Sequence, residues 1–431
     1  MNKPLCVVSS PCFSRSGYGD HARSIIKSLF EIDKYDVKLI PMPWGATPNI
    51  ELDPSNEFYN RMLQSALREN LTTKPDIWIQ ITIPNEFQAN GVKSIGITAG
   101  IEATLTKPEW IDGCNRMDLV ITTSKFSADI LKNNKFEKRN KQTNQVEGRL
   151  ELVKPIEVLF EGLDLTIYDK SFPIKPVVTA ELSKIKEDFA FLFAGGWLQG
   201  NLGHDRKDIG MLIKVFLDTF KRKRKTPALI LKTHGAGFSI SEFEIIRDKI
   251  EQIQELIRTE GWKGDFPPIY ILNGELSDEE MNSLYNHPKV KAMVSFTHGE
   301  GYGRPLQEFT ITGKPLFASG WSGHIDFLHP EYSFLLPGKM IKVDRSAQND
   351  WLIDGAEWFQ VDYSYASKIL MDCYENYDKY LEKSRKHPKF TKDNFSEKKM
   401  SEKFLEILEK YINFQEKPSE FKLTLPKLKK A

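Results

Sequence analysis

The 431-residue sequence has few cysteines, no long apolar run and no excess of either charge. Its four cysteines, Cys6, Cys12, Cys114 and Cys373, lack the spacing of metal ligands, so we expect reduced, intracellular thiols. No stretch approaches the ~20 apolar residues that span a bilayer, and the N-terminus shows no signal-peptide pattern. The formal net charge of +1 offers no global field that would recruit nucleic acid or anionic lipid. These absences favour a cytoplasmic globular protein.

The chain length indicates two domains, because 431 residues exceed one average hydrophobic core. Apolar runs of strand length alternate with helix-like segments, which predicts doubly wound α/β domains with parallel sheets. We place an N-terminal domain at residues 1–170 and a second domain at residues 185–370, joined by the proline-containing segment SFPIKPVV. Residues 371–431 are expected to form C-terminal helices and a basic tail.

The most informative stretch, Val294–Leu328, predicts a strand, a glycine-rich loop, a helix and a second strand. Pro305 suits the first turn of a helix, and Gly313 suits its end. The apolar run Pro315–Ala318 reads as the second strand. The stretch therefore has the order of one βαβ unit.

Two carboxylates flank the glycine-rich loop, Glu300 before the expected helix and Glu308 inside it. Gly301 and Gly303 would let the backbone approach a ligand closely, and amides at a helix start bind anions. Carboxylates repel phosphate and accept hydrogen bonds from hydroxyl groups. One anion site between two hydroxyl acceptors fits a nucleotide-sugar.

The run EGYGRPLQE, followed by GKPLFASGWSGHIDFL, resembles the donor-site signature of retaining GT-B-fold glycosyltransferases of family 4, the group 1 type. The resemblance implies two Rossmann-like domains that face a cleft, with a C-terminal helix crossing back to the first domain. It also implies transfer of a hexose from a nucleotide-diphosphate-sugar to an acceptor hydroxyl, with retention and without metal or cofactor. The likeness covers most of the second domain and the first domain only loosely.

The resemblance also assigns roles within this loop. Glu300 would hold hydroxyls of the transferred sugar, and Glu308 would hold the ribose hydroxyls. The amides of Gly301, Tyr302 and Gly303 would bind phosphate. The alternative is a structural strand–loop–helix unit of another doubly wound domain.

Departure of a nucleotide diphosphate requires cations that offset its growing negative charge. Arg206 and Lys207 follow a strand and loop, where the resembling family places an Arg-Lys pair that binds the diphosphate. Lys232, at the end of an apolar run, is a second candidate, because ligands bind at the carboxyl ends of strands in α/β sheets. Solvated or structural lysines are the alternative for both. Arg304 could add charge near the phosphates or point to solvent.

The first domain offers candidates for the acceptor side. Glu102 follows the expected strand Lys93–Thr98, in a loop where many relatives carry a His. It could bind a hydroxyl, act as a general base in an inverting enzyme, or only cap an amide. In the resembling family the loop after the first strand helps to bind the acceptor or the donor phosphates, which makes Gly17 and Tyr18, beside Arg15-Ser16, candidates by position. The alternative is a loop that only closes a turn.

Several local expectations concern the ends of helices and the loops. We expect Asp20 to cap the first helix and Asp278 to cap a later one. Residues 133–149 are polar and basic, which favours an exposed loop or mobile insertion and leaves open a docking surface for an anionic acceptor. Residues 363–380 and 396–414 look helical.

Other functions remain open at the level of sequence. The chain could bind a nucleotide or sugar-phosphate without transfer, or could glycosylate a hydroxylated nucleic-acid base. The basic runs 221–225 and 422–430 motivate the second possibility, although the balanced net charge favours solvated faces. Glycoside hydrolysis by two carboxylates leaves the Arg-Lys pair unexplained. The acceptor could be a carbohydrate, a lipid or another hydroxyl compound, and peripheral membrane contact is open.

Overall fold

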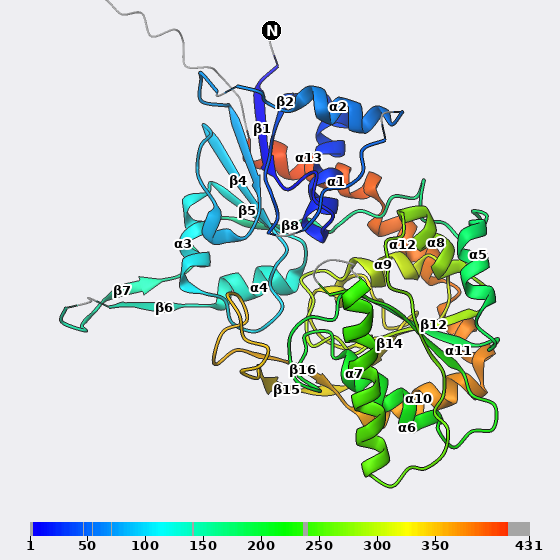
Figure 1. The fold of residues 1–431 in the computed structure, drawn as a ribbon. Coiled ribbons are helices and arrows are strands. Elements are labelled where there is room, and N and C mark those ends of the chain that lie inside the picture. The colour runs from blue at the N-terminus through cyan, green and yellow to red at the C-terminus, as the bar shows by residue number, and fades with distance from the viewer. Residues whose placement is uncertain are drawn as a thin grey trace, which may run out of the picture.

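The computed structural model describes residues 3–45, 47–53, 55–69, 71–139, 142–235 and 240–412. Two α/β domains make up the chain, each built on a six-stranded parallel sheet with helices on its faces (Figure 1). Within the described residues, no helix is both long and apolar enough to cross a membrane. The basic run 422–430 lies outside the described residues.

The first sheet has the strand order β2-β1-β3-β4-β5-β8. Its strands are β1 (Leu5–Ser10), β2 (Asp36–Pro41), β3 (Ile77–Ile81), β4 (Lys93–Thr98), β5 (Leu119–Thr122) and β8 (Ile156–Val158). The helical segments of this domain are α1 (Gly17–Ile32), α2 (Glu57–Ser65), η1 (Pro84–Glu86), α3 (Pro108–Arg116) and α4 (Lys125–Asn133). The order of the strands reverses between β1 and β3.

The second sheet has the order β11-β10-β9-β12-β13-β14, the arrangement of a Rossmann domain. Its strands are β9 (Ala190–Ala194), β10 (Ala228–Lys232), β11 (Ile269–Ile271), β12 (Val290–Ser295), β13 (Leu316–Ser319) and β14 (Phe334–Leu336). Both β9 and β10 are buried along their whole length, as expected for strands covered on two faces. The strand order reverses between β9 and β12, and ligands bind at such a point in α/β sheets.

Helices cover both faces of the second sheet and continue to Tyr411. They are α5 (Pro176–Ser183), α6 (Ile209–Phe220), α7 (Ile240–Thr259), α8 (Asp278–Asn286), α9 (Arg304–Thr310), η2 (Gly323–Asp326), α10 (Tyr363–Glu375), α11 (Tyr377–Ser384), α12 (His387–Phe395) and α13 (Glu397–Tyr411). An antiparallel pair, β15 (Gly338–Lys342) and β16 (Glu357–Val361), follows β14. The stretch expected to be one helix, 363–380, is two helices, because Asn376 ends α10 and begins α11.

The last helix returns to the first domain, as the GT-B resemblance implies. In Figure 1 the orange-red α13 lies beside the blue α1. The apolar face of α13, with Met400, Phe404 and Leu408, belongs to the hydrophobic core of the first domain. Glu397, at the start of α13, pairs with Lys27 of α1 at 2.6 Å. Helix α13 therefore packs into the core of the first domain together with α1.

Both predicted helix caps were wrong, because in each case a serine earlier in the sequence caps the helix. The Oγ of Ser16 accepts a hydrogen bond from the amide of Gly19, so α1 begins at Gly17, before Asp20. Ser277, not Asp278, caps α8 and forms a capping box with Glu280. Serine and aspartate are equally good caps, so residue type alone did not choose between neighbouring positions.

Residues 133–149 are mostly exposed, as predicted for an exposed loop or mobile insertion, but the prediction of a loop was wrong. Apart from residues 140–141, which lie outside the described residues, this segment holds the antiparallel strands β6 (Phe136–Arg139) and β7 (Val146–Leu150). The hairpin extends away from the first domain (Figure 1). Its base is anchored by the pair Phe136 and Leu150, which pack in the core of that domain. The polar composition reflects exposed strand positions and does not exclude a strand.

Candidate active site

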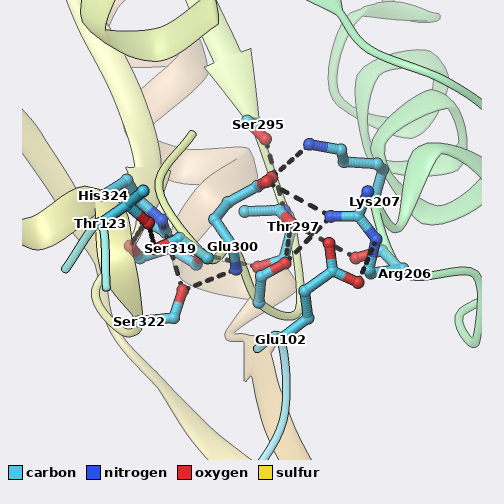
Figure 2. A network of polar contacts seen from close by, with 12 residues as sticks. Glu102, Thr123, Arg206, Lys207, Ser295, Thr297, Glu300, Ser319, Ser322 and His324 are labelled. Carbon is cyan, nitrogen blue, oxygen red and sulfur yellow. Dashed lines mark hydrogen bonds and ion pairs between the residues drawn. The ribbon is translucent and has the colours of Figure 1, made fainter. Parts of the chain in front are cut away.

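Three of the predicted residues meet at the carboxyl edge of the second sheet, where the strand order reverses. Glu300 lies in the loop after β12, and Arg206 and Lys207 lie in the loop between β9 and α6. Lys207 Nζ forms an ion pair with Glu300 Oε1, and Arg206 Nη1 lies 3.3 Å from Glu300 Oε2 (Figure 2). Arg206 also donates to the carbonyl of Gly299 at 3.2 Å. The cations and the carboxylate therefore form one buried group.

A second layer of polar contacts fixes the loop that carries Glu300. The amide of Glu300 donates to Ser322 Oγ at 2.9 Å, and the amide of His298 donates to the carbonyl of Arg206 at 2.8 Å. The ring of His298 stacks on Trp358 at a centroid distance of 4.5 Å. Ser322 has φ 78°, a conformation that side chains other than glycine adopt at a cost. Sequence reasoning missed Ser322, whose only signal is its place in the loop GWSGH.

The electrostatics keep Glu300 ionised. Burial by itself would raise the pKa of Glu300, but the positive charges of Lys207 and Arg206 outweigh it and hold that pKa at about 2. Burial and the neighbouring Arg206 lower the pKa of Lys207, although Glu300 opposes them. An ionised carboxylate beside two cations can accept hydrogen bonds from hydroxyl groups while the cations face an anion.

Glu102 brings the first domain into the same group. Its Oε2 lies 3.0 Å from Arg206 Nε (Figure 2). Burial raises the pKa of Glu102, and the negative charge of Glu300 adds to that rise, while Arg206 opposes it. Two hydrogen bonds of 2.8 Å between Thr104 and Glu357 of β16 hold the Glu102 loop against the second domain. The site thus spans both domains.

The glycines of the loop lie where the two domains meet. A Cβ on Gly301 would lie 1.6 Å from the carbonyl oxygen of Ala99, and one on Gly299 would lie 2.0 Å from that of Glu102. We expected Gly301 to allow a ligand close to the backbone, and in the structure it allows the first domain's backbone to approach. Gly303 has φ 100° and precedes α9, a left-handed conformation that favours glycine.

Tyr18 supports the loop that carries Glu102. Its hydroxyl lies 2.9 Å from Thr98 Oγ1 and accepts a hydrogen bond from the amide of Ala99 at 3.1 Å. Its ring stacks on Trp44 with centroids 4.3 Å apart. Gly17 begins α1, and a Cβ there would meet no described atom within 4 Å. The structure therefore joins Tyr18, but not Gly17, to the Glu102 loop.

The second predicted carboxylate, Glu308, lies in a different polar group. Arg304 Nε donates to its Oε1 at 3.2 Å, and the hydroxyl of Tyr285 donates to its Oε2 at 2.9 Å. Arg304 also approaches Glu161, with Nη1 and Oε2 3.8 Å apart. The possibility that Arg304 points to solvent was wrong, because only 16% of its side chain is exposed. Sequence reasoning missed Tyr285.

Burial dominates the titration of this second group. It raises the pKa of Glu308 to about 7, although Arg304 opposes it. It raises the pKa of Glu161 to about 8, again against Arg304. Tyr302 turns into the core, where its hydroxyl donates to the carbonyl of Glu161 at 2.9 Å. One guanidinium thus serves two buried carboxyl groups.

Lys232 belongs to neither the Glu300 group nor the Glu308 group. Its ammonium donates to the carbonyl of Gly274 at 2.7 Å, in the loop after β11. Burial lowers its pKa to about 8, and the nearby Arg15 adds to that effect. Arg15, from the first domain, forms an ion pair with Glu275 of the same loop. Within the described ranges, His, Cys, Asp and Glu side chains form no group of three that could hold a metal ion.

No protein-family profile and no curated protein matches this sequence. Solved structures do match. A glycosyltransferase from Rickettsia africae is 13% identical with a TM-score of 0.60, over 96% of this chain and 100% of that chain. Sucrose-phosphate synthase from Thermosynechococcus elongatus is 11% identical with a TM-score of 0.60, over 95% of this chain and 99% of its own.

A third match is HepE from Anabaena, solved in complex with UDP and glucose. It is 14% identical with a TM-score of 0.56, and the match covers 94% of this chain and 99% of that chain. At these identities the likeness concerns the fold. The chain has the GT-B fold, two Rossmann-like domains with a C-terminal helix that returns to the first.

Proposed function

We propose that the protein is a glycosyltransferase that moves a hexose from a nucleotide-diphosphate-sugar to an acceptor hydroxyl. One observation carries the proposal: Arg206 and Lys207 contact Glu300 at the point where the order of the second sheet reverses. Transfer breaks the bond between the sugar carbon and the diphosphate oxygen and forms a bond to the acceptor oxygen. The two cations would offset the charge that grows on the departing diphosphate.

The other residues of the site fit the same reaction. Glu300 is ionised and would accept hydrogen bonds from sugar hydroxyls. Glu308 would accept those of the ribose. Glu102, from the first domain, would serve the acceptor side; it contacts Arg206, so binding of a diphosphate to Arg206 would change the partner of Glu102. Gly301, Tyr302 and Gly303 would supply backbone amides to the phosphates.

Two finer points belong to the proposal. Retention rests on the resemblance of EGYGRPLQE to retaining enzymes, with the acceptor's proton passing to the departing diphosphate. We also propose transfer without a metal ion, and the position of Arg206 and Lys207 supports this, since they would supply the charge that a metal supplies elsewhere. Because HepE, a protein of the same fold, was solved with UDP and glucose, UDP-glucose is the first donor to test.

The test measures release of nucleoside diphosphate from UDP-glucose, GDP-mannose and ADP-glucose, with simple sugars and alkyl glycosides as acceptors. We expect the wild type to turn over one donor. Glu300→Gln should lower kcat by about 10²-fold or more, because it removes the ionised carboxylate that accepts hydrogen bonds from the sugar hydroxyls. Glu331→Gln, at an exposed glutamate, is the control. Turnover of no donor by the wild type, or an unchanged rate in Glu300→Gln, would contradict the proposal.

A further inference from the structure

The carboxylate of Glu308 is held at both of its oxygens. Arg304 Nε, one turn earlier on α9, donates to Oε1 at 3.2 Å. The Tyr285 hydroxyl, at the end of α8, donates to Oε2 at 2.9 Å. Each carboxylate oxygen accepts about two hydrogen bonds, so each oxygen keeps capacity for one more donor. Two adjacent hydroxyls of one ligand could use that remaining capacity.

Tyr285 is a rigid donor. Its side chain is fully buried, and its ring meets that of Phe309 edge to face at 5.8 Å and 90°. Burial and the nearby charge of Glu308 raise its pKa well above the usual range, so the phenol keeps its proton. A buried phenol with a fixed ring offers its hydrogen in one direction only.

Arg304 is held in turn by the segment that connects the domains. Its Nη1 lies 3.8 Å from Oε2 of Glu161, which follows β8. The carbonyl of Glu161 accepts hydrogen bonds from Tyr302 at 2.9 Å and from Gln307 Nε2 at 2.8 Å. Both donors to Glu308 are thus fixed by buried neighbours, and the carboxylate has little freedom to rotate.

We propose that Tyr285 is a positioning residue that fixes the direction of the Glu308 carboxylate and thereby makes the site select ribonucleotides over 2′-deoxyribonucleotides. The inference rests on the proposed function, in which Glu308 receives the ribose hydroxyls. A carboxylate held by Tyr285 and Arg304 presents both oxygens to the 2′- and 3′-hydroxyls together. Without the phenol, Oε2 can turn away and the 2′-hydroxyl loses its acceptor.

The test is calorimetric titration of UDP, GDP and ADP, each beside its 2′-deoxy counterpart, into wild type and Tyr285→Phe. We expect the wild type to prefer the ribonucleotide, and Tyr285→Phe to bind the ribonucleotide about tenfold more weakly with little change for the deoxy form. The discrimination ratio therefore falls about tenfold. A loss of general packing would weaken both nucleotides alike and leave the ratio unchanged.

Two further variants complete the design. Tyr380→Phe removes a similar bond, from a buried Tyr hydroxyl to Asp372 at 2.6 Å, on α11 and away from the site, and should leave the ratio unaltered. Glu308→Gln should also lower the ratio and serves if Tyr285→Phe does not fold. An unchanged ratio in a folded Tyr285→Phe protein overturns the inference alone, whatever Glu308→Gln does, and an unchanged ratio in Glu308→Gln overturns it where Tyr285→Phe does not fold. Failure of the wild type to bind any nucleotide overturns the proposed function as well.

Discussion

Glu300 and Glu308 lie eight residues apart on one loop and helix and are equally buried, at 6% exposure each, yet their titration is opposite. Burial would raise the pKa of both. Lys207 and Arg206 overcome it at Glu300, where the pKa is about 2. At Glu308 a single guanidinium, Arg304, does not, and the pKa is about 7. Burial alone therefore does not decide the charge of a carboxyl group in this site.

The difference comes from how many carboxyl groups share each cation. Arg304 serves both Glu308 and Glu161, and Asp278 adds negative charge nearby. Glu300 pairs with Lys207 and shares Arg206 with Glu102. The Glu300 group is suited to an anionic leaving group, and the Glu308 group to a neutral ligand that carries hydroxyls.

The largest effect is expected from removing the cation that is closest to Glu300. Lys207→Ala should lower kcat/KM for the nucleotide-sugar by about 10²–10³-fold, since a preorganised charge at the leaving group is lost. Steady-state kinetics of nucleoside diphosphate release measure it. Lys214→Ala, which breaks an ion pair with Asp218 on the outside of α6, is the control and should retain full activity. Equal rates in the two variants would contradict the role of Lys207.

The contrast also predicts opposite pH profiles of stability. The pKa of Glu300 is depressed to about 2, so its ionisation stabilises the fold above about pH 4.5, and this contribution is lost as the pH falls towards 2. Glu300→Gln should therefore cost up to about 3 kcal/mol at pH 7 and progressively less in acid. Urea unfolding followed by tryptophan fluorescence measures the difference. A constant difference across the whole pH range would refute the depressed pKa.

Glu308 should behave in the reverse way. Its pKa is raised to about 7, so the folded state holds the proton more tightly and stability falls as the pH rises from about 4.5 to 7. Glu308→Gln cannot ionise and should exceed the wild type in stability by up to about 3 kcal/mol at pH 8, with no gain near pH 4.5. Urea unfolding of the two proteins at both pH values measures this difference in stability. A Glu308→Gln protein less stable than wild type at pH 8 contradicts the account.

A smaller effect is expected at the meeting of the two domains. Gly301→Ala places a Cβ against the carbonyl of Ala99 and should reduce stability by about 1–3 kcal/mol through overpacking, with loss of activity. Gly148→Ala, where a Cβ meets no described atom within 4 Å, is the matched control. Thermal melting of both variants gives the comparison, and equal melting temperatures would show that the backbones do not meet so closely.

The smallest effect is expected in the β6–β7 hairpin. Arg139 pairs with Glu137 at 2.6 Å, and both side chains are about half exposed. Arg139→Ala should change the free energy of unfolding by less than about 0.5 kcal/mol, because exposed ion pairs are screened by water. A change in KM for an anionic acceptor, with stability unaltered, would indicate that the hairpin docks that acceptor.

The sequence allowed prediction of the fold and of the loop around Glu300, because strand, glycine, proline and helix signals there are local. Pro305 lies in the first turn of α9, and Gly313 follows its end with φ 69°. The GT-B arrangement with a returning C-terminal helix was also predicted from the residues that resemble that fold.

Partners from distant segments could not be predicted in the same way. Tyr285 meets Glu308, and Ser322 meets the amide of Glu300, only after the sheet has formed. Arg304 is a charged residue that pairs, with little exposure, with Glu308 and with Glu161 in the connecting segment. The hairpin was missed because its strands are mostly polar, with Phe136 and Leu150 packing in the core. Local sequence patterns predict helices and strands, whereas the contacts that make up the site form between residues of different helices, strands and loops.

The most direct test of the central claim is calorimetric binding of nucleoside diphosphates to wild type and to an Arg206→Ala/Lys207→Ala double variant. If these two side chains hold the diphosphate, the wild type binds one of UDP, GDP or ADP, and the double variant binds it about 100-fold more weakly or not at all. Equal affinity of the two proteins for that nucleotide would contradict the claim.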